Sequence, residues 1–327
     1  PGPRSRFDAA VMTAVADGSG YTGDRARVVR PWSPKTPAWA APLLFLSPAF
    51  VTLGLWIYWP LIEAFRLSFF EWNLLPTIDP VFVGLENYRN LMALPELRIA
   101  AWNTVLYTVG LLPLTVLLPL VVALMTREAV GRAGPVYRAL IFVPMVIAPV
   151  VVAIVWRWLL NPDHGIINSL LQEIGLGPFR FLQDAGTAIW SIVFITGWKL
   201  LGFSTLLFSA AMTGIDRSLI EAARIDGATE GQVARRIIVP LVKPTTLFLT
   251  VLTVLHGAQW SFVYINVLTQ GGPRNATTNL YYLLWEYGFG TFAIGWSTAA
   301  GMLLFAVFGV FAVWGVKAMK THDDSAS

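Results

Sequence analysis

GIDRSLIEAARIDGATEGQVARRIIVPLVKP, residues 214–244, is a polar segment that lies between two apolar runs of the chain. Leu219, Ala222 and Ala223 recur in it at helical spacing, which predicts a short helix. Gly227 stands where that helix would end, because glycine accepts the left-handed conformation that closes many helices. The first half of the segment is therefore predicted to be one short, capped helix.

The second half of the segment predicts another helix. Thr229 is expected to begin it, with Gln232 three residues later as in a capping box. Pro240 and Pro244 are expected to close it, because proline cannot continue a helix without breaking its hydrogen bonds. Its apolar edge consists of Val233, Ile237 and Ile238. Residues 214–244 are thus expected to fold as a helical hairpin.

The composition is that of a membrane protein. Hydrophobic residues make up 56% of the chain and charged residues 13%, about half the charged share that is usual for a soluble domain. Runs of about 20 apolar residues recur, each long enough for a transmembrane helix. We therefore predict an all-α polytopic membrane protein.

Six spans are expected, at about 38–60, 101–126, 137–157, 187–211, 244–268 and 292–316. Sixteen Lys and Arg residues fall in the two termini and in the segments after the second and fourth spans, against five in the three alternating segments. By the positive-inside rule, this asymmetry places both termini and residues 214–244 in the cytoplasm. Four prolines interrupt the expected spans and predict bends inside a helical bundle: Pro113, Pro119, Pro144 and Pro149.

The two ends of the chain are expected to lie outside the membrane domain. Residues 1–37 lack the apolar continuity that would offset the entropy of ordering them, so they are predicted to be a disordered cytoplasmic tail. Residues 319–327 are predicted to be a cytoplasmic C-terminal tail. The remaining residues, 38–318, would form the transmembrane domain.

The sequence offers little for catalysis or metal binding. It has no cysteine, which excludes a disulfide framework, a thiolate metal site and a cysteine nucleophile. Its histidines, His164, His256 and His322, lack the paired spacing of a zinc site. No Gly-x4-Gly-Lys-Ser/Thr sequence occurs, so we expect no ATP site and no cofactor in this chain. Its basic residues are not gathered with stacking aromatics, so no nucleic-acid partner is expected.

Three short motifs stand out in residues 214–244. They are Glu221-Ala222-Ala223, Asp226-Gly227-Ala228, and the group Ile237, Pro240 and Pro244. In order and spacing they resemble the EAA loop in the permease subunits of binding-protein-dependent ATP-binding-cassette (ABC) importers. Ala234 and Val239 depart from the pattern, since many relatives carry a bulky aromatic residue and leucine at these positions.

Further matches lie outside this segment and are similar to the carbohydrate-uptake branch, the sugar and glycerol-3-phosphate permeases. They are Phe82 to Tyr88, Asn161-Pro162 with Gly165-Ile166-Ile167, Gly271-Gly272-Pro273 with Ala276-Thr277-Thr278, and Tyr287-Gly288-Phe289. The resemblance covers roughly residues 40–318. It implies the type I ABC importer permease fold and a place in the bacterial cytoplasmic membrane.

The resemblance also implies a function and a set of partners. Such a permease passes a sugar or related polyol by alternating access and is not itself an enzyme. Its partners would be a homologous second permease, two ATPase subunits that hold ATP and Mg, an extracytoplasmic solute-binding protein and membrane lipid.

Two alternatives come from other classes of membrane protein. One is an ion- or proton-coupled secondary transporter, which would be expected to carry paired intramembrane acids, and none is visible in the expected span centres. The other is a membrane sensor or assembly scaffold. Purification discriminates among the three, because an importer permease should bring ATPase subunits with it.

Residues 214–244 hold the candidate ATPase-coupling site. The apolar residues of the hairpin, each worth roughly 1.5–3 kcal/mol when buried, need a cover that a solvated loop would lack. By resemblance, the first loop helix inserts into a groove on the nucleotide-binding subunit, and Glu221 pairs with that subunit. The candidate coupling residues are Leu219, Ile220, Glu221, Ala222, Ala223, Ile225, Asp226, Gly227 and Pro240.

Two of the expected spans carry candidates for the solute path. Lys199 lies in the fourth span, where a charge costs about 2.5–3.5 kcal/mol on insertion scales, so its ammonium should face a bundle interior, a cavity or a partner. The sequence allows two roles for Lys199: pairing with other groups of the protein, or contact with the solute. The fifth span carries amides, a hydroxyl and aromatic faces that suit a polyol, although interhelical hydrogen bonds would use the same side chains: Gln259, Trp260, Tyr264 and Asn266.

Overall fold

The computed structural model describes residues 40–75, 77–127 and 133–324. The predicted tail at residues 1–37 lies outside the described residues. The chain divides into two compact units, Pro1–Ile57 and Tyr58–Ser327. In the first unit, helix α2 (Ala40–Leu53) exposes nearly all of its described side chains, which are mostly apolar.

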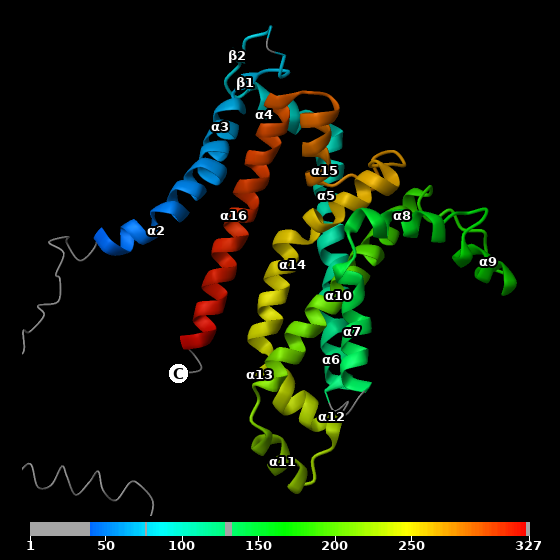
Figure 1. Cartoon of the computed structure of the whole chain (residues 1–327). Coiled ribbons are helices and arrows are strands. Elements are labelled where there is room, and N and C mark those ends of the chain that lie inside the picture. The colour runs from blue at the N-terminus through cyan, green and yellow to red at the C-terminus, as the bar shows by residue number, and fades with distance from the viewer. Residues whose placement is uncertain (1–39, 76, 128–132, 325–327) are drawn as a thin grey trace, which may run out of the picture. The chain divides into compact units, whose positions relative to one another are not determined.

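The described residues include five helices that are long and apolar enough to cross a membrane, and one bent pair that gives a sixth span (Figure 1). The five are Pro42–Leu67, Pro95–Thr126, Ala185–Thr213, Lys243–Thr269 and Ile294–Val313, and the pair is Ala139–Val146 with Pro149–Leu159. The prediction of an all-α polytopic protein with about six spans is confirmed.

In chain order, the helices after α2 are α3 (Trp59–Leu67), α4 (Glu86–Ala93), α5 (Pro95–Leu112), α6 (Leu118–Thr126), α7 (Ala133–Val146), α8 (Pro149–Leu159), α9 (Ile166–Glu173), α10 (Ala185–Thr213), α11 (Arg217–Ile225), α12 (Glu230–Val233), α13 (Val239–Leu241), α14 (Lys243–Tyr264), α15 (Leu280–Trp285) and α16 (Ile294–Asp324). Between them lie the π-helical turns η1 (Gly54–Tyr58), η2 (Pro113–Leu117), η3 (Ala234–Ile238), η4 (Ile265–Thr269) and η5 (Glu286–Gly290). Two short strands, β1 (Phe70–Glu71) and β2 (Val81–Phe82), pair antiparallel.

Three of the π-helical turns are explained by a proline. In η1, η2 and η3 a proline stands two residues after the turn, at Pro60, Pro119 and Pro240. A proline has no N–H, and its ring collides with the carbonyl four residues earlier, which belongs to the central residue of each turn. The wider π turn moves that carbonyl aside and keeps the helix continuous.

The expected span at residues 137–157 is bent, as its prolines predicted, because α7 and α8 meet at an angle of 102°. Pro149 begins α8 and lacks the N–H that an unbroken helix would need there. Ala148, which precedes the proline, has a ψ of 135° and so lies outside the helical region, as residues before proline prefer. Pro149 therefore ends one helix and starts another.

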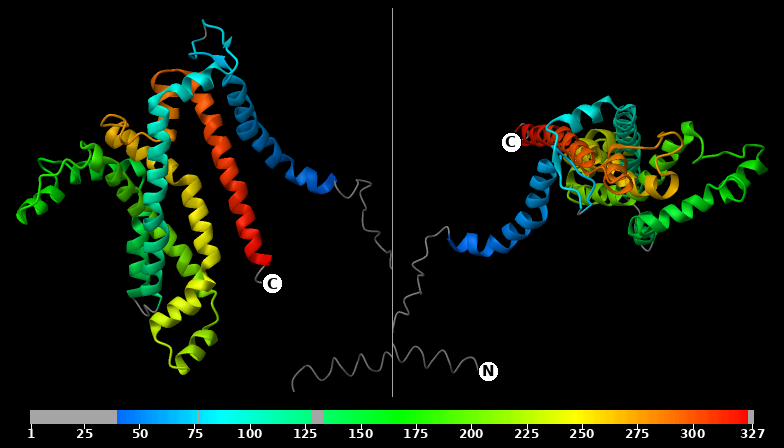
Figure 2. Two further views of the ribbon diagram at one scale, coloured as in Figure 1. Left: turned by 180° about the vertical axis from the view of Figure 1, so that it is seen from behind. Right: turned by 90° about the horizontal axis from the view of Figure 1, so that it is seen from above.

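Helix α10 is the centre of the second unit and contacts α5, α6, α7 and α14 (Figure 2). One buried cluster surrounds its first half and includes Tyr107, Ile192, Ile195, Tyr264 and Tyr282. A second surrounds its last turns and includes Phe208, Met212, Val233, Ile238 and Leu249. Helix α7 comes so close that a Cβ at Gly202 would collide with the carbonyl oxygen of Ile141.

The motif at residues 82–88 organises the segment between α3 and α4. The side-chain amide of Asn87 donates to the backbone oxygens of Ser68 and Phe70, each at 2.9 Å. The hydroxyl of Tyr88 donates to Ser68 Oγ at 2.7 Å. This motif therefore holds the two-stranded hairpin against the end of α3.

Candidate functional site

Helix α11 forms the first arm of the predicted hairpin, with both ends capped. At its start, the carboxylate of Asp216 accepts a hydrogen bond from the backbone N–H of Ser218 at 2.9 Å. This bond, together with one from the Ser218 hydroxyl, holds the pKa of Asp216 below its ordinary value. At its end, Gly227 has a φ of 83°, and the N–H of Ala228 donates to the carbonyl of Ala223 at 2.9 Å. The predicted short helix and its glycine cap are confirmed.

The second arm consists of α12, η3 and α13. The backbone N–H of Thr229 donates to Gln232 Oε1 at 2.8 Å, and the N–H of Gln232 donates to Thr229 Oγ1 at 3.4 Å. The capping box is therefore formed. The expectation that Pro240 closes the second arm is wrong, because the arm continues through Pro240 to Leu241, and the wide turn η3 makes room for the proline ring. The prediction of a folded helical hairpin is confirmed.

The chain covers most of the hairpin's apolar side chains itself. Val233 and Ile238 of the second arm are fully buried. Three more pack against the same cluster and are half-buried: Ile220, Ala223 and Ile237. Leu219 is 51% exposed and Ile225 is 86% exposed. Leu241, at the end of the second arm, is 49% exposed. The apolar side chains of α11 that still need a cover from another subunit are therefore Leu219 and Ile225.

The exposed residues of α11 form one continuous surface. Glu221 and Ala222 are exposed between Leu219 and Ile225, and Asp226 is exposed directly after them. Because the other side of α11 rests on the buried cluster of the second arm, the surface is held in place before any partner binds. We call these five residues the coupling surface.

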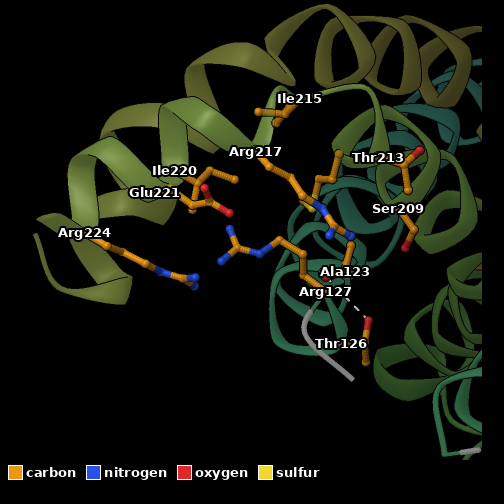
Figure 3. Close-up of a pocket in the computed structure, with 11 residues that line it drawn as sticks. Ala123, Thr126, Arg127, Ser209, Thr213, Ile215, Arg217, Ile220, Glu221 and Arg224 are labelled. Atoms are coloured by element: carbon orange, nitrogen blue, oxygen red, sulfur yellow. Dashed lines mark hydrogen bonds between the residues drawn. The ribbon is translucent and has the colours of Figure 1, made fainter. Parts of the chain in front are cut away.

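A pocket of about 490 Å³ lies between α11 and the ends of α6 and α10 (Figure 3). Arg217 and Glu221 line it from α11, and Arg127 lines it from the end of α6. Hydroxyls of Thr126, Ser209 and Thr213 complete its polar wall. A polar, charged space therefore lies beside the apolar contact between α11 and the membrane helices.

One carboxylate joins three segments beside this pocket. Glu230 of α12 accepts from Arg127 Nη2 at 3.1 Å and from Arg224 Nε at 2.7 Å. Glu230 is 58% exposed, so these ion pairs contribute little to stability and serve to orient α11 against α6. The sequence analysis missed this bridge, because 103 residues separate Arg127 from Glu230.

Lys199, predicted for the solute path, has a structural environment in this chain. Its ammonium donates to the carbonyl oxygens of Pro144, Met145 and Ile147 at 3.0, 2.9 and 2.6 Å. These are carbonyls at the end of α7, where the bend before α8 removes their helical partners. All three ammonium donors are thus satisfied by the broken span.

The candidates on α14 do not form one group. Gln259 is exposed, and its Oε1 lies 2.8 Å from His256 Nδ1. The His256 ring stacks on Trp260, with centroids 5.8 Å apart. Tyr264 is instead buried in the cluster around α10, and its hydroxyl has no hydrogen-bond partner among the described residues. Asn266 lies in η4 and is half-buried.

His256 lies beside Gln259 and Trp260, although it was not among the residues predicted for the solute path. Its spacing of three and four residues from Gln259 and Trp260 was the signal that could have found it. Because Gln259 Oε1 can only accept, His256 Nδ1 is the donor, and the amide nitrogen of Gln259 is left to donate elsewhere. This trio places an exposed amide and two half-buried rings on α14 within a membrane span.

The spans and the hairpin define a polytopic membrane component of a transport system. The chain belongs to the family of binding-protein-dependent transport system inner membrane components, whose model matches residues 115–320. This membership places the chain in the inner membrane as a multi-pass permease of an ABC importer, as the motifs predicted, and excludes the secondary-transporter and sensor alternatives.

Similar proteins support the same assignment. The sn-glycerol-3-phosphate transport system permease protein UgpA of Shigella flexneri is 33% identical over 270 residues, which cover 80% of this chain and 88% of that protein. The probable ABC transporter permease protein YurN of Bacillus subtilis (strain 168) is 33% identical over 286 residues, covering 86% and 97%. A bacterial ABC transporter involved in the import of the acidic polysaccharide alginate has a TM-score of 0.76 at 25% identity, covering 86% and 96%.

Proposed function

We propose that this permease forms half of the translocation path for a sugar or related polyol and couples it to a separate ATPase subunit through α11. The observation that carries the proposal is the coupling surface, where Leu219 and Ile225 stay exposed on a helix that is otherwise capped and packed. Burying what remains exposed of these two side chains on a partner would contribute roughly 2–4 kcal/mol. Glu221, exposed between them, supplies a charge that a basic residue of the partner can meet.

The complete importer in this proposal has several subunits. A homologous second permease would supply the other half of the path, two ATPase subunits would hold ATP and Mg, and an extracytoplasmic binding protein would deliver the solute. The charge asymmetry of sixteen against five supports an orientation with both termini and the hairpin in the cytoplasm. This chain itself binds no nucleotide in the proposal and acts as a transport subunit.

The solute class rests on the trio of α14, in which Gln259 is exposed and His256 and Trp260 are half-buried. The amide of Gln259, the ring of His256 and the face of Trp260 offer hydrogen bonds and an apolar plane, the combination that suits a sugar ring. Among the relatives, one permease serves sn-glycerol-3-phosphate, and one transporter imports alginate. Both solutes are hydroxylated compounds, which supports the same class here.

Recovery of the complex tests the coupling surface. Ile225→Asp should insert normally but lower the ATPase recovered with a tagged permease by roughly tenfold or more, because a charge replaces an apolar contact. Gly231→Asp is the matched control, since it adds the same charge to α12, where no atom lies within 4 Å of the added Cβ. Equal ATPase recovery in the two variants would remove the coupling role from α11.

A further inference from the structure

Two pockets meet at the end of α10 that lies away from the hairpin. The first, which we call the arginine pocket, has a volume of about 520 Å³ and is lined by Arg157, Asn161, Arg180 and Gln183. The second, the apolar pocket, has about 530 Å³ and is lined by Trp156, Ile167, Trp190 and Phe194. Leu160 and Phe181 belong to both linings, so the pockets are adjacent.

The arginine pocket carries two positive charges. Arg157 donates from Nη2 to the carbonyl oxygen of Val267, which fixes its guanidinium between α8 and η4. A guanidinium has five N–H donors, so others remain available in the planar fork. No described residue accepts a hydrogen bond from the Arg180 guanidinium or pairs with it.

An amide adds a further oriented donor. Asn161 Oδ1 accepts from the backbone N–H groups of Asp163 and His164, each at 2.9 Å. Because a backbone N–H can only donate, this fixes the amide so that its nitrogen faces away from the turn. Gly165 permits this tight turn, since a Cβ there would collide with the carbonyl oxygen of Leu159.

Acidic side chains do not balance these donors. None of the described residues that line the arginine pocket is Asp or Glu. Asp184, the acid next to Gln183, accepts the N–H of Gly186 at 2.7 Å and caps α10. Two arginines with neutral donors and no acid suit an oxyanion, and a phosphate is one of the groups that match a guanidinium fork.

The apolar pocket extends from this site along α10. Its α10 residues run from Gly186 to Phe194, a rise of roughly 12 Å along a helix that spans the membrane. The hydroxyls in its wall are engaged, since Thr187 donates to Phe181 O at 3.0 Å and Ser191 donates to Thr187 O at 3.0 Å. The pocket therefore offers a hydrocarbon chain an apolar lining that begins beside the arginines.

We propose that the two pockets together bind one anionic phospholipid, with its phosphate in the arginine pocket and an acyl chain in the apolar pocket. The two positive charges and the neutral donors match the phosphate of such a lipid. The depth of the apolar pocket along α10 matches its acyl chain. Trp156 and Trp190 lie beside the chain, where interfacial aromatics are common. The site would join α10 to α8, the second half of the broken span.

Tryptophan quenching in the assembled importer tests the site. The complex, purified and delipidated in a maltoside detergent, is titrated with phosphatidylglycerol whose acyl chains are brominated. We expect saturable quenching, with an amplitude that falls in Trp190→Phe. Arg180→Gln should raise the half-saturating lipid concentration by about fivefold, the effect of one basic residue near a lipid phosphate.

Matched controls separate the lipid from other occupants. Arg274→Gln removes the same charge from an exposed residue of a neighbouring loop and should leave the titration unchanged. Brominated phosphatidylcholine should quench less, and inorganic phosphate or glycerophosphoglycerol should not reverse quenching, because neither carries an acyl chain. Reversal by these soluble anions would assign the pocket to a small solute. Equal titrations for wild type and Arg180→Gln, or no quenching because a second permease covers the pocket, would overturn the proposal.

Discussion

The two ends of α10 are built in opposite ways. The hairpin after Thr213 is organised by bonds between residues three to five positions apart, such as Ala228 with Ala223 and Thr229 with Gln232. The two pockets at the opposite end of α10 are assembled from distant segments, as the 110 residues between Arg157 and Val267 illustrate. A locally built end can dock on a partner as a preformed unit, whereas the other end depends on how the helices are packed.

This difference has a functional consequence under the proposed arrangement. The hairpin can keep its fold through its own caps, while its buried side chains pack against α6 and α10 and would pass a movement of α11 on to these helices. The opposite end changes shape whenever α8 and η4 shift against α10. Transport by alternating access requires one part that transmits motion and one part that opens. The hairpin end of α10 suits the first role, and the end beside the two pockets suits the second.

The largest expected effect concerns the sides of the membrane on which the two ends lie. The natural chain has no cysteine, so single cysteines report their own accessibility. Cysteines at Asp163 and Arg274 should react with an impermeant reagent in intact cells, and a cysteine at Thr229 should react only after permeabilisation. Reaction of the Thr229 cysteine in intact cells would show that the hairpin faces the outside. The hairpin could then not be the end of α10 that meets an ATPase subunit.

The second prediction concerns the middle of α10. Lys199→Met leaves three carbonyls at the end of α7 without their donor, in a site where Lys199 is only 8% exposed. We expect a loss of roughly 3 kcal/mol in the free energy of unfolding, seen as a lower thermal midpoint of the purified permease. Lys243→Met, at an exposed lysine that begins α14, is the control and should leave the midpoint near that of wild type. An unchanged midpoint in Lys199→Met combined with lost uptake would instead assign the ammonium to the solute path.

The same contrast explains what the sequence could predict. Both arms of the hairpin were predicted, with the Gly227 cap of the first and the capping box of the second, because these residues act within one helical turn. Pro240 was wrongly expected to end the second arm. The six spans followed from apolar length alone. The carbonyl partners of Lys199, 52 to 55 residues away, and the bridge from Glu230 to Arg127 could not be predicted, since no local rule specifies which distant turns meet. Pro149 signalled a bend, but the angle of 102° depends on how α8 packs.

The smallest expected effect comes from substitutions at two glycines of the hairpin. It tests whether bonds between neighbouring residues hold the hairpin together. Two of its glycines differ in conformation: Gly227 has a φ of 83°, whereas Gly231 lies inside α12 with a negative φ. Neither has an atom within 4 Å of an added Cβ, so packing does not confuse the comparison. Gly227→Ala should therefore destabilise the cap of α11 by about 1 kcal/mol, through backbone strain alone. Gly231→Ala should stabilise the second arm by about 0.5–1 kcal/mol, because alanine loses less entropy than glycine in a helix.

Hydrogen exchange of the α11 amides in the purified permease measures both changes. Gly227→Ala should raise the exchange rates of α11 by about fivefold, the equivalent of 1 kcal/mol, while Gly231→Ala should leave them equal or lower. Because ATPase coupling would use the angle that Gly227 sets between the two arms, uptake should fall in Gly227→Ala and persist in Gly231→Ala. Similar exchange in the two variants would mean that the hairpin is held by its contacts with the membrane helices and not by its own caps, so the two ends of α10 would be built alike.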